Sequence, residues 1–237
     1  MKTGNIRDAV ITPIDAHREI VITTDGCTGV GLLDKDFIHI SMKVVAGLTA
    51  RVALMEIVTQ KAIPVAYSFN HIANNDLFFE TQKGFIEAFE KFGFYNVPYV
   101  ASSEKNFKVY QTSITISITG LRDIQTQKEY INPSYIVIGD PLVGQEILDF
   151  PEKMITPKDV LQLLNNQYVY EIIPCGSGGI YNELKNFGIV SVQSEVDLMK
   201  SAGPASCALV IIDSKGMAEL KQIYGSKFHE IKVKTNE

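Results

Sequence analysis

The sequence has few cysteines, and none of them is spaced as a metal ligand. Among its 237 residues only Cys27, Cys175 and Cys207 carry thiols, and they stand far apart with no CxxC motif. Isolated cysteines argue against a disulfide framework or a zinc site, and they suit a reducing compartment. We therefore expect the three thiols to be small packing side chains.

Three other features are missing. The N-terminal MKTGNIRDAV lacks the apolar core of a signal peptide. The uncharged runs 109–121 and 201–212 are too short and too rich in polar residues to span a bilayer. A net charge of -5 argues against a broad basic surface for nucleic acid, but allows a local cluster that holds one phosphate. We expect a cytoplasmic protein that binds neither membrane nor nucleic acid.

Strand-like and helix-like segments alternate along the first half. The spacing of apolar residues predicts a helix over 44–62 that stops before Pro64. A second helix is expected after Asn74 or Asn75, with a phenylalanine stripe that ends at Gly93. Strands are predicted at 19–24, 37–42, 64–70 and 112–119. The last of these alternates isoleucine with Ser or Thr, so one of its faces should be buried.

The second half begins after a polar, turn-rich segment that follows Gly120. We place the domain boundary there, with an N-terminal domain at 1–125 and a short C-terminal α/β domain at 133–237. Strands are predicted at 135–139, 205–212 and 229–233, and helices are expected to begin at Thr156-Pro157, at Ile180 and at Ser214. The pattern as a whole predicts an α+β fold of two domains.

The segment TTDGCTGVG at 23–31 is the first candidate site, because Asp25 stands at the expected end of a strand. The glycines Gly26, Gly29 and Gly31 let a backbone approach a ligand closely. An acid beside such a loop can hold Mg²⁺ against a phosphate. An Asp-Gly turn between two strands explains the same residues equally well.

Two further candidates lie on the helix 44–62 and immediately before the strand-like residues 109–119. Glu56 shares a helical stripe with polar neighbours, where a solvated side chain is the ordinary alternative. Arg51 is a possible phosphate clamp or a surface charge. The segment SSEKN at 102–106 offers Glu104, Lys105 and Asn106 for a metal and a phosphate, or forms an ordinary solvated loop.

A glycine cluster, CGSGG at 175–179, precedes a predicted helix. Backbone N–H groups at a helix N-terminus can bind an anion, but the same glycines can serve a tight turn and close packing. Both readings stay open. No serine or cysteine stands in a nucleophile-elbow context, so nothing favours covalent catalysis.

The order of these segments resembles the superfamily of aminoimidazole ribonucleotide synthetase, thiamine-monophosphate kinase and selenophosphate synthetase. The matching parts are VITTDGCTGVG (21–31), ARVALMEIVTQKAIP (50–64) and SSEKNFKVYQTSITISITG (102–120), with a weaker match at SAGPASCALVII (201–212). The resemblance implies a homodimer in which the N-terminal sheets join into a barrel, with ATP and Mg²⁺ bound near that interface.

The same resemblance assigns roles to three acids. Asp25 falls on the strand-end acid that binds Mg²⁺, Glu56 on a helix acid of the metal–nucleotide site, and Glu104 on a loop acid before the long strand. The acid pair that the kinase carries earlier in its chain is missing here, which leaves Asp8 or Asp15 as substitutes.

Within the superfamily, the short second domain, the early Arg7-Asp8 and the SEKN loop look most like alpha-ribazole kinase. That likeness implies an ATP-dependent enzyme that phosphorylates a small alcohol, the 5′-hydroxyl of alpha-ribazole. An ATP-dependent synthetase, a thiamine-phosphate-type kinase and a non-catalytic nucleotide-binding protein are the alternatives.

Overall fold

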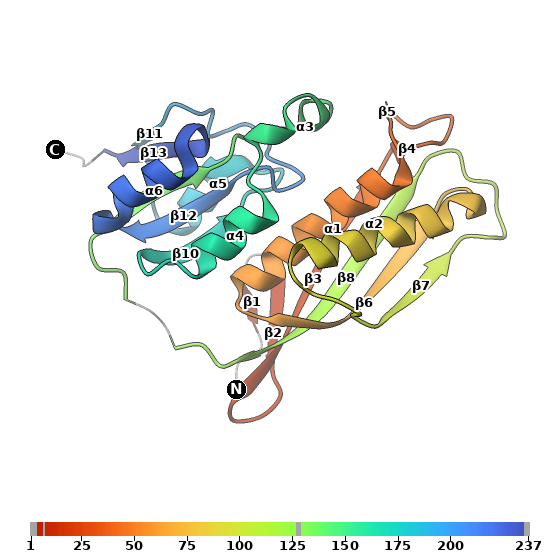
Figure 1. The fold of residues 1–237 in the computed structure, drawn as a ribbon, viewed down its shortest axis with the longest axis horizontal. Helices are drawn as coiled ribbons and strands as arrows, with labels where there is room; N and C mark the ends of the chain where they lie inside the picture. The colour runs from red at the N-terminus through yellow and green to blue at the C-terminus, as the bar shows by residue number, and fades with distance from the viewer. Residues whose placement is uncertain (1–3, 7, 127–128, 235–237) are drawn as a thin grey trace. The chain divides into compact units, whose positions relative to one another are not determined.

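The structure is a computed structural model that describes residues 4–6, 8–126 and 129–234. The chain divides into two compact units between Gln125 and Thr126. Each unit has its own sheet and helices (Figure 1). The α+β fold class predicted from the sequence is confirmed. In the described part of the chain, no helix is both long enough and apolar enough to cross a membrane.

The first unit is built on a six-stranded sheet in the order β1-β2-β3-β8-β6-β7, antiparallel except for the parallel pair β6–β7. The strands are β1 (Gly4–Ile6), β2 (Ala9–Pro13), β3 (Arg18–Thr28), β6 (Ile63–Ile72), β7 (Tyr99–Ser103) and β8 (Ser113–Asp123). The alternation predicted for 112–119 is confirmed, because Ile114, Ile116 and Ile118 of β8 are completely buried.

Two helices, α1 (Met42–Thr59) and α2 (Phe78–Lys91), cover one face of this sheet (Figure 1). They approach each other closely at Gly84, where a Cβ atom would lie 2.3 Å from the carbonyl oxygen of Lys43. The predicted apolar stripe of α2 is confirmed, since Phe85, Phe89 and Phe92 are buried. Gly93, at φ +84°, ends the helix as expected.

Two boundaries in this unit differ from the sequence prediction. The strand expected at 37–42 is wrong: only Ile38–His39 is extended, as β5, and it pairs in parallel with β4 (Val30–Gly31). Ser41 instead caps α1, its side chain accepting a hydrogen bond from the Val44 N–H. Asn74 makes no side-chain capping bond and precedes a short 3₁₀ turn, Asn75–Leu77, before α2 begins.

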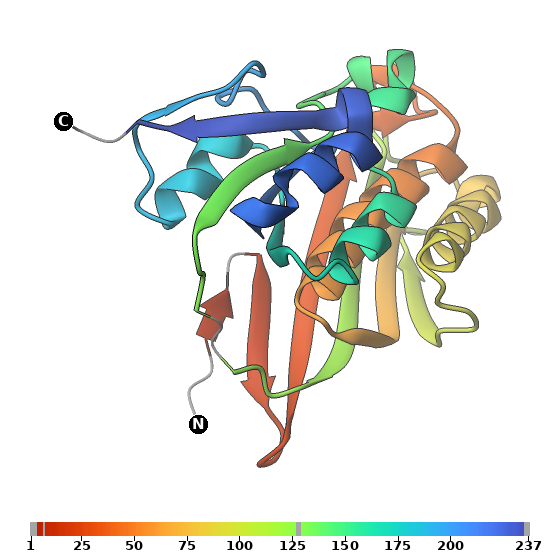
Figure 2. The ribbon, with the colours of Figure 1, turned by 60° about the vertical axis from the view of Figure 1, so that its left-hand side comes forward.

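The second unit has a five-stranded antiparallel sheet in the order β10-β12-β9-β13-β11. Its strands are β9 (Pro133–Ile138), β10 (Val169–Pro174), β11 (Val192–Gln193), β12 (Ala208–Asp213) and β13 (Phe228–Val233). Its helices are α3 (Glu146–Asp149), α4 (Pro157–Leu164), α5 (Gly179–Asn186) and α6 (Met217–Tyr224). Figures 1 and 2 show α4 and α6 on one face of the sheet and α5 on the other.

Helices on both faces explain why β12 is apolar at successive positions. Leu209 and Ile211 share a buried cluster with Ile180 and Leu184 of α5, while the residues between them point to the opposite face. The predicted helix start at Thr156-Pro157 is confirmed by a complete capping box between Thr156 and Asp159. The helix expected from Ser214 begins with a 3₁₀ turn and continues as α6.

Candidate functional site

Asp25 lies inside a strand, which corrects the expectation that it stands at a strand end. β3 runs on through Thr28, and Asp25 pairs with Ile116 of β8. Gly26 reads as a turn residue in the sequence, but it pairs with Thr115 and continues the ladder. The carboxyl group of Asp25 is therefore held on a fixed backbone.

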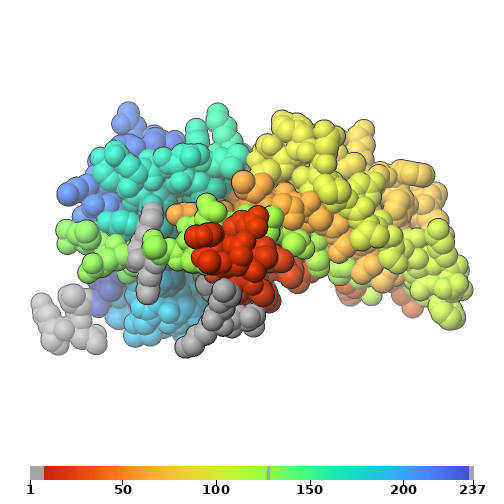
Figure 3. Space-filling model, turned by 90° about the horizontal axis from the view of Figure 1, so that it is seen from below, coloured from red at the N-terminus to blue at the C-terminus, as the bar shows by residue number. Residues whose placement is uncertain are grey.

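The Asp25 side chain is partly buried, and this changes its acidity. Burial, and to a smaller extent the negative charge of Asp8, raise the pKa of the Asp25 carboxyl to about 6, against a backbone hydrogen bond from Gly26 that lowers it. β2 lies antiparallel to β3 with Ala9 opposite Thr23, so Asp8 stands just before β2, one strand away from Asp25. The strand β2, red in Figure 3, lies at the surface of the face shown.

Asp15, the other substitute considered for the missing acid pair, lies at the far end of β3. It sits in the β2–β3 turn and pairs with Arg18 at 2.8 Å. Backbone N–H groups and Arg18 lower the pKa of its carboxyl to about 2. Asp15 therefore stabilises the turn, and Asp8 is the acid that acts on Asp25.

The glycines after Asp25 serve mainly to let the chain pack on itself. A Cβ atom at Gly26 would lie 2.9 Å from the Thr115 side chain, and one at Gly31 would lie 2.4 Å from the Thr112 hydroxyl. Gly29 has a φ of +77°, which favours glycine. Much of the space that these glycines leave open is filled by the protein's own atoms.

No motif in the sequence singles out Asp36, a buried carboxylate next to these glycines. It accepts hydrogen bonds from the Thr112 N–H at 2.8 Å, from the Thr112 hydroxyl at 2.7 Å and from the Leu33 N–H at 2.8 Å. These bonds tie the 29–37 segment to the start of β8. Its acceptor sites are occupied by the fold, so Asp36 has a structural role.

Glu56 and Arg51 are both buried on α1, which corrects the expectation that each is a surface charge unless it binds a ligand. The helix contacts the sheet on one side and α2 on another, so its polar stripe is covered as well as its apolar one. Sequence periodicity missed this because it assumes one solvated face per helix.

The three acids assigned by resemblance lie on separate parts of the first unit. α1 is antiparallel to β3, because Thr23 bonds to Ala53 and the Ile57 side chain approaches Gly120, the partner of Val21. Asp25 is thus opposite the turn of α1 near Thr49, about 10 Å along the helix from Glu56.

Glu104 follows β7, and two strands, β8 and β6, separate β7 from β3. It caps its own loop: its carboxylate accepts from the backbone N–H groups of Asn106 and Phe107, which lowers its pKa. Lys105 and Asn106 are exposed next to it. Among the described residues, no three His, Cys, Asp or Glu side chains are grouped to hold a metal ion.

The arrangement at Asp25 and Asp8 nevertheless fits Mg²⁺. Mg²⁺ prefers hard oxygen ligands and commonly takes only one or two carboxylates from the protein, with phosphates and water completing its shell. The Asp25 carboxyl is destabilised as an anion by burial and by a like charge. A cation between the two acids relieves both effects.

In the second unit, the structure favours the packing reading of CGSGG. Gly179 has a φ of +72°, and a Cβ atom there would lie 2.8 Å from the carbonyl oxygen of Lys200. The N–H of Tyr181 donates to the carbonyl of Leu198, and the N–H of Ala202 donates to that of Gly176. The glycines thus let α5 start against the 198–202 segment.

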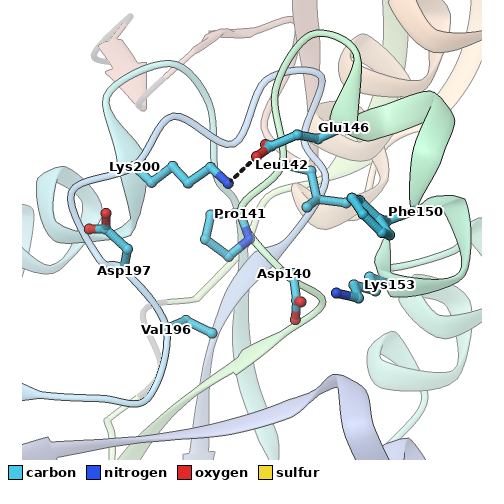
Figure 4. Close-up of a pocket in the computed structure, with 9 residues that line it drawn as sticks. All are labelled: Asp140, Pro141, Leu142, Glu146, Phe150, Lys153, Val196, Asp197 and Lys200. Atoms are coloured by element: carbon cyan, nitrogen blue, oxygen red, sulfur yellow. Dashed lines mark hydrogen bonds and ion pairs between the residues drawn. The ribbon is translucent and has the colours of Figure 1, made fainter.

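A cavity of about 260 Å³ opens in the second unit between α3 and the 196–200 segment (Figure 4). Lys200 bonds to Glu146 across it at 2.8 Å, and Asp140 pairs with His229 at the same distance. Lys153 lies over the ring of Phe150. Glu146 and Lys200 thus satisfy each other's charge across the cavity.

No family model matches the chain, and no curated protein does either. Solved structures of the superfamily named above share its fold. They include PurL of T. maritima complexed with AMPPCP, with a TM-score of 0.62 and 12% identity over 93% of this chain and 41% of that one. This chain therefore spans about two fifths of the length of PurL.

Two shorter proteins match over most of both chains. HypE of E. coli, a hydrogenase maturation protein, has a TM-score of 0.57 and 14% identity, covering 90% of this chain and 78% of that one. Thiamine monophosphate kinase of Aquifex aeolicus has a TM-score of 0.57 and 11% identity, with 95% and 88% covered. At these identities the likeness establishes the fold.

Proposed function

We propose that this protein is an ATP-dependent small-molecule kinase with its Mg²⁺ site at Asp25. The observation that carries the proposal is the carboxyl of Asp25, partly buried on β3, with a pKa raised to about 6 and the charge of Asp8 nearby. Functional carboxylates are often found in such environments. PurL structures of the same fold complexed with ATP and AMPPCP support the choice of nucleotide.

In this proposal Asp25 and Asp8 are the two protein ligands of Mg²⁺. When bound, the ion neutralises phosphate charge in the transfer step. Folding places Asp25 on β3 and Asp8 just before the neighbouring strand β2, so the energetic cost of bringing the two like charges near each other is met in folding. Phosphoryl transfer needs little more than position and charge, and no dedicated base is required.

The remaining predicted residues are proposed to contact the nucleotide. Lys105 and Asn106 are exposed in the loop after β7 and can reach a phosphate if that loop moves toward β3. Glu104 shapes this loop through its backbone bonds. Arg51 and Glu56, both buried on α1, are proposed to support the site from the helix. Gly26 is exposed on β3 and is proposed to let a phosphate approach that strand.

For the acceptor we propose the 5′-hydroxyl of alpha-ribazole, on the sequence resemblance described above. A second candidate, an ATP-dependent synthetase, is favoured by the fold match to a phosphoribosylformylglycinamidine synthase from Thermotoga maritima, at a TM-score of 0.51 and 12% identity. A kinase accumulates a phosphorylated alcohol, whereas a synthetase releases phosphate and ADP when it joins its substrates.

The test is a screen of ADP formation with alpha-ribazole, thiamine phosphate and small alcohols, with products identified by mass spectrometry. Asp25→Asn should abolish turnover while circular dichroism shows an intact fold. Asp15→Asn makes the same change at the other end of β3 and should leave turnover near wild type. Full turnover by a folded Asp25→Asn protein contradicts the proposed site.

We further propose that the protein is a homodimer. The face of the first sheet opposite α1 and α2 carries exposed apolar side chains, among them Val10, Ile22 and Val65. Exposed apolar side chains on a sheet face that no helix covers are typical of an interface. Joining two such sheets face to face corresponds to the barrel implied by the resemblance.

A further inference from the structure

A cavity of about 450 Å³ opens in the first unit, at the edge of the sheet away from β3. It lies between the C-terminal part of α2, the segment 92–98 and the strands β6 and β7. Its volume is in the range of sites that bind small organic molecules. Three strands, β8, β6 and β7, follow β3 in the sheet order, so this cavity is separate from the Asp25 site.

Aromatic rings form much of the cavity wall. Tyr67 stacks with Phe89 at 4.5 Å between ring centroids and with Tyr99 at 5.0 Å. Phe94 is a further wall residue. The hydroxyl of Tyr99 is held by a hydrogen bond from the Gln82 side chain. Flat, apolar walls of this kind favour a flat ligand that can stack on them.

The hydroxyl of Tyr67 is the unusual group in this cavity. Tyr67 is only 4% exposed, and its hydroxyl has no hydrogen-bond partner among the described residues. Burial raises the pKa of this phenol, so it stays protonated and can donate. A buried hydroxyl without a partner is unfavourable, and native structures seldom keep one without a reason.

We propose that this cavity binds a small planar aromatic molecule with an acceptor atom, and that this atom accepts a hydrogen bond from the Tyr67 hydroxyl. Glu90 on the wall disfavours an anion, so the ligand is neutral or cationic. Tyr99 belongs to the edge strand β7 and is 39% exposed, so its side chain can turn outward to admit the ligand. The site is independent of the proposed kinase activity.

The test uses two probes of the same shape, isoquinoline and naphthalene. Both are flat and neutral at pH 7.5, and only isoquinoline carries an acceptor nitrogen. Binding to the full chain is followed by NMR titration. Isoquinoline should bind about fivefold more tightly, the size of one hydrogen bond, and should shift the resonances of Tyr67, Phe89 and Tyr99. Equal affinity of the two probes, or no binding of isoquinoline at millimolar concentration, overturns the proposal.

Tyr67→Phe removes only the hydroxyl and keeps the ring. The variant should lose the preference for isoquinoline, bind naphthalene at least as well, and melt at the same temperature as the wild type or higher. Tyr95→Phe, on an exposed tyrosine of the 92–98 segment, is the control and should keep the preference. A retained preference in Tyr67→Phe, or a marked fall in its melting temperature, shows that the hydroxyl has another partner and contradicts the site.

Discussion

The hydroxyl of Thr23 donates a 2.9 Å hydrogen bond to the carbonyl oxygen of Ala53, and this bond fixes α1 on β3. Asp25 lies two residues further along the same face of the strand. The helix runs in the opposite direction, so Glu56 lies on the other side of the Thr23 contact. The two acids that the resemblance assigns to one site therefore lie on opposite sides of the Thr23–Ala53 contact.

Removing the Thr23 hydroxyl should loosen that attachment. Thr23→Val keeps the shape of the side chain and loses the bond, at a cost of about 1–2 kcal/mol in the free energy of unfolding. Chemical denaturation measures this directly. Thr24→Val is the control: its hydroxyl donates a 2.9 Å hydrogen bond to the Ile116 carbonyl on the exposed face of the same strand, where water can replace that bond, and its loss should cost less. Equal losses in the two variants contradict a special role for the Thr23–Ala53 bond.

The raised pKa of Asp25 makes stability depend on pH. The unfolded carboxyl ionises near 3.8 and the folded one near 6, so the wild type loses stability as the pH rises between these values. Asp25→Asn lacks this loss and should be more stable at pH 7 by about 1–3 kcal/mol. Well below pH 3.8 the carboxyl is protonated in both the folded and the unfolded state, and the gain should disappear. Urea titrations at about pH 3 and at pH 7 measure the two free energies of unfolding.

Asp8 should act on Asp25 through its charge. Asp8→Asn is expected to lower the Asp25 pKa, measured by NMR, and to weaken Mg²⁺ binding, measured as a smaller rise in melting temperature with added Mg²⁺ and ATP. Asp15→Asn removes a charge that pairs with Arg18 and should change neither quantity. If Asp15→Asn weakens Mg²⁺ binding more than Asp8→Asn does, the metal lies near Asp15 and the proposed site at Asp25 is wrong.

Gly179 should not tolerate a side chain. Gly179→Ala meets the carbonyl oxygens of residues 198–200 and a positive φ, and should lose more than about 1 kcal/mol of stability. Gly176→Ala is the matched control, because a Cβ atom there meets nothing within 4 Å. Thermal melts compare the two, and similar losses exclude close packing as the reason for the glycine cluster.

The proposed dimer can be broken on the uncovered face of the first sheet. Ile22→Lys places a charge among exposed apolar side chains and should convert a dimer to a monomer in light scattering. Ile223→Lys changes an exposed isoleucine of α6 in the second unit and should leave the mass unchanged. A wild-type protein that is monomeric at micromolar concentration rules the dimer out.

Much of the fold follows from local patterns in the sequence. Two features could be predicted because they depend on near neighbours in the chain. One is the buried face of the strand with Ile114, Ile116 and Ile118, and the other is the helix start at Thr156 and Asp159. The extension of β3 through Gly26 was missed, since pairing with Thr115 outweighs the turn preference of Asp-Gly. Strand propensity alone cannot reveal a partner 89 residues away in the chain.

The candidate site was only partly predictable for the same reason. Asp25 stood out through its glycine-rich neighbourhood, whereas the influence of Asp8 depends on the β2–β3 pairing. Burial of Glu56 requires that α2 and the sheet both contact α1. The sequence shows Tyr67 only as a residue of a predicted strand. The burial of its hydroxyl depends on tertiary packing and could not be predicted.

The continuous pairing of β3 with β8 also determines which part of the first unit can move when a ligand binds. Asp25 is embedded in a ladder that runs from Arg18 to Thr28, so it cannot shift without breaking several backbone bonds. The segment after Ser103 has no such ladder as far as Thr112. Hydrogen exchange should therefore be slow and insensitive to nucleotide at Asp25, while protection gained on binding should appear between Glu104 and Tyr110. Asp25 thus keeps its position when a ligand binds, and the segment between Glu104 and Tyr110 changes its conformation.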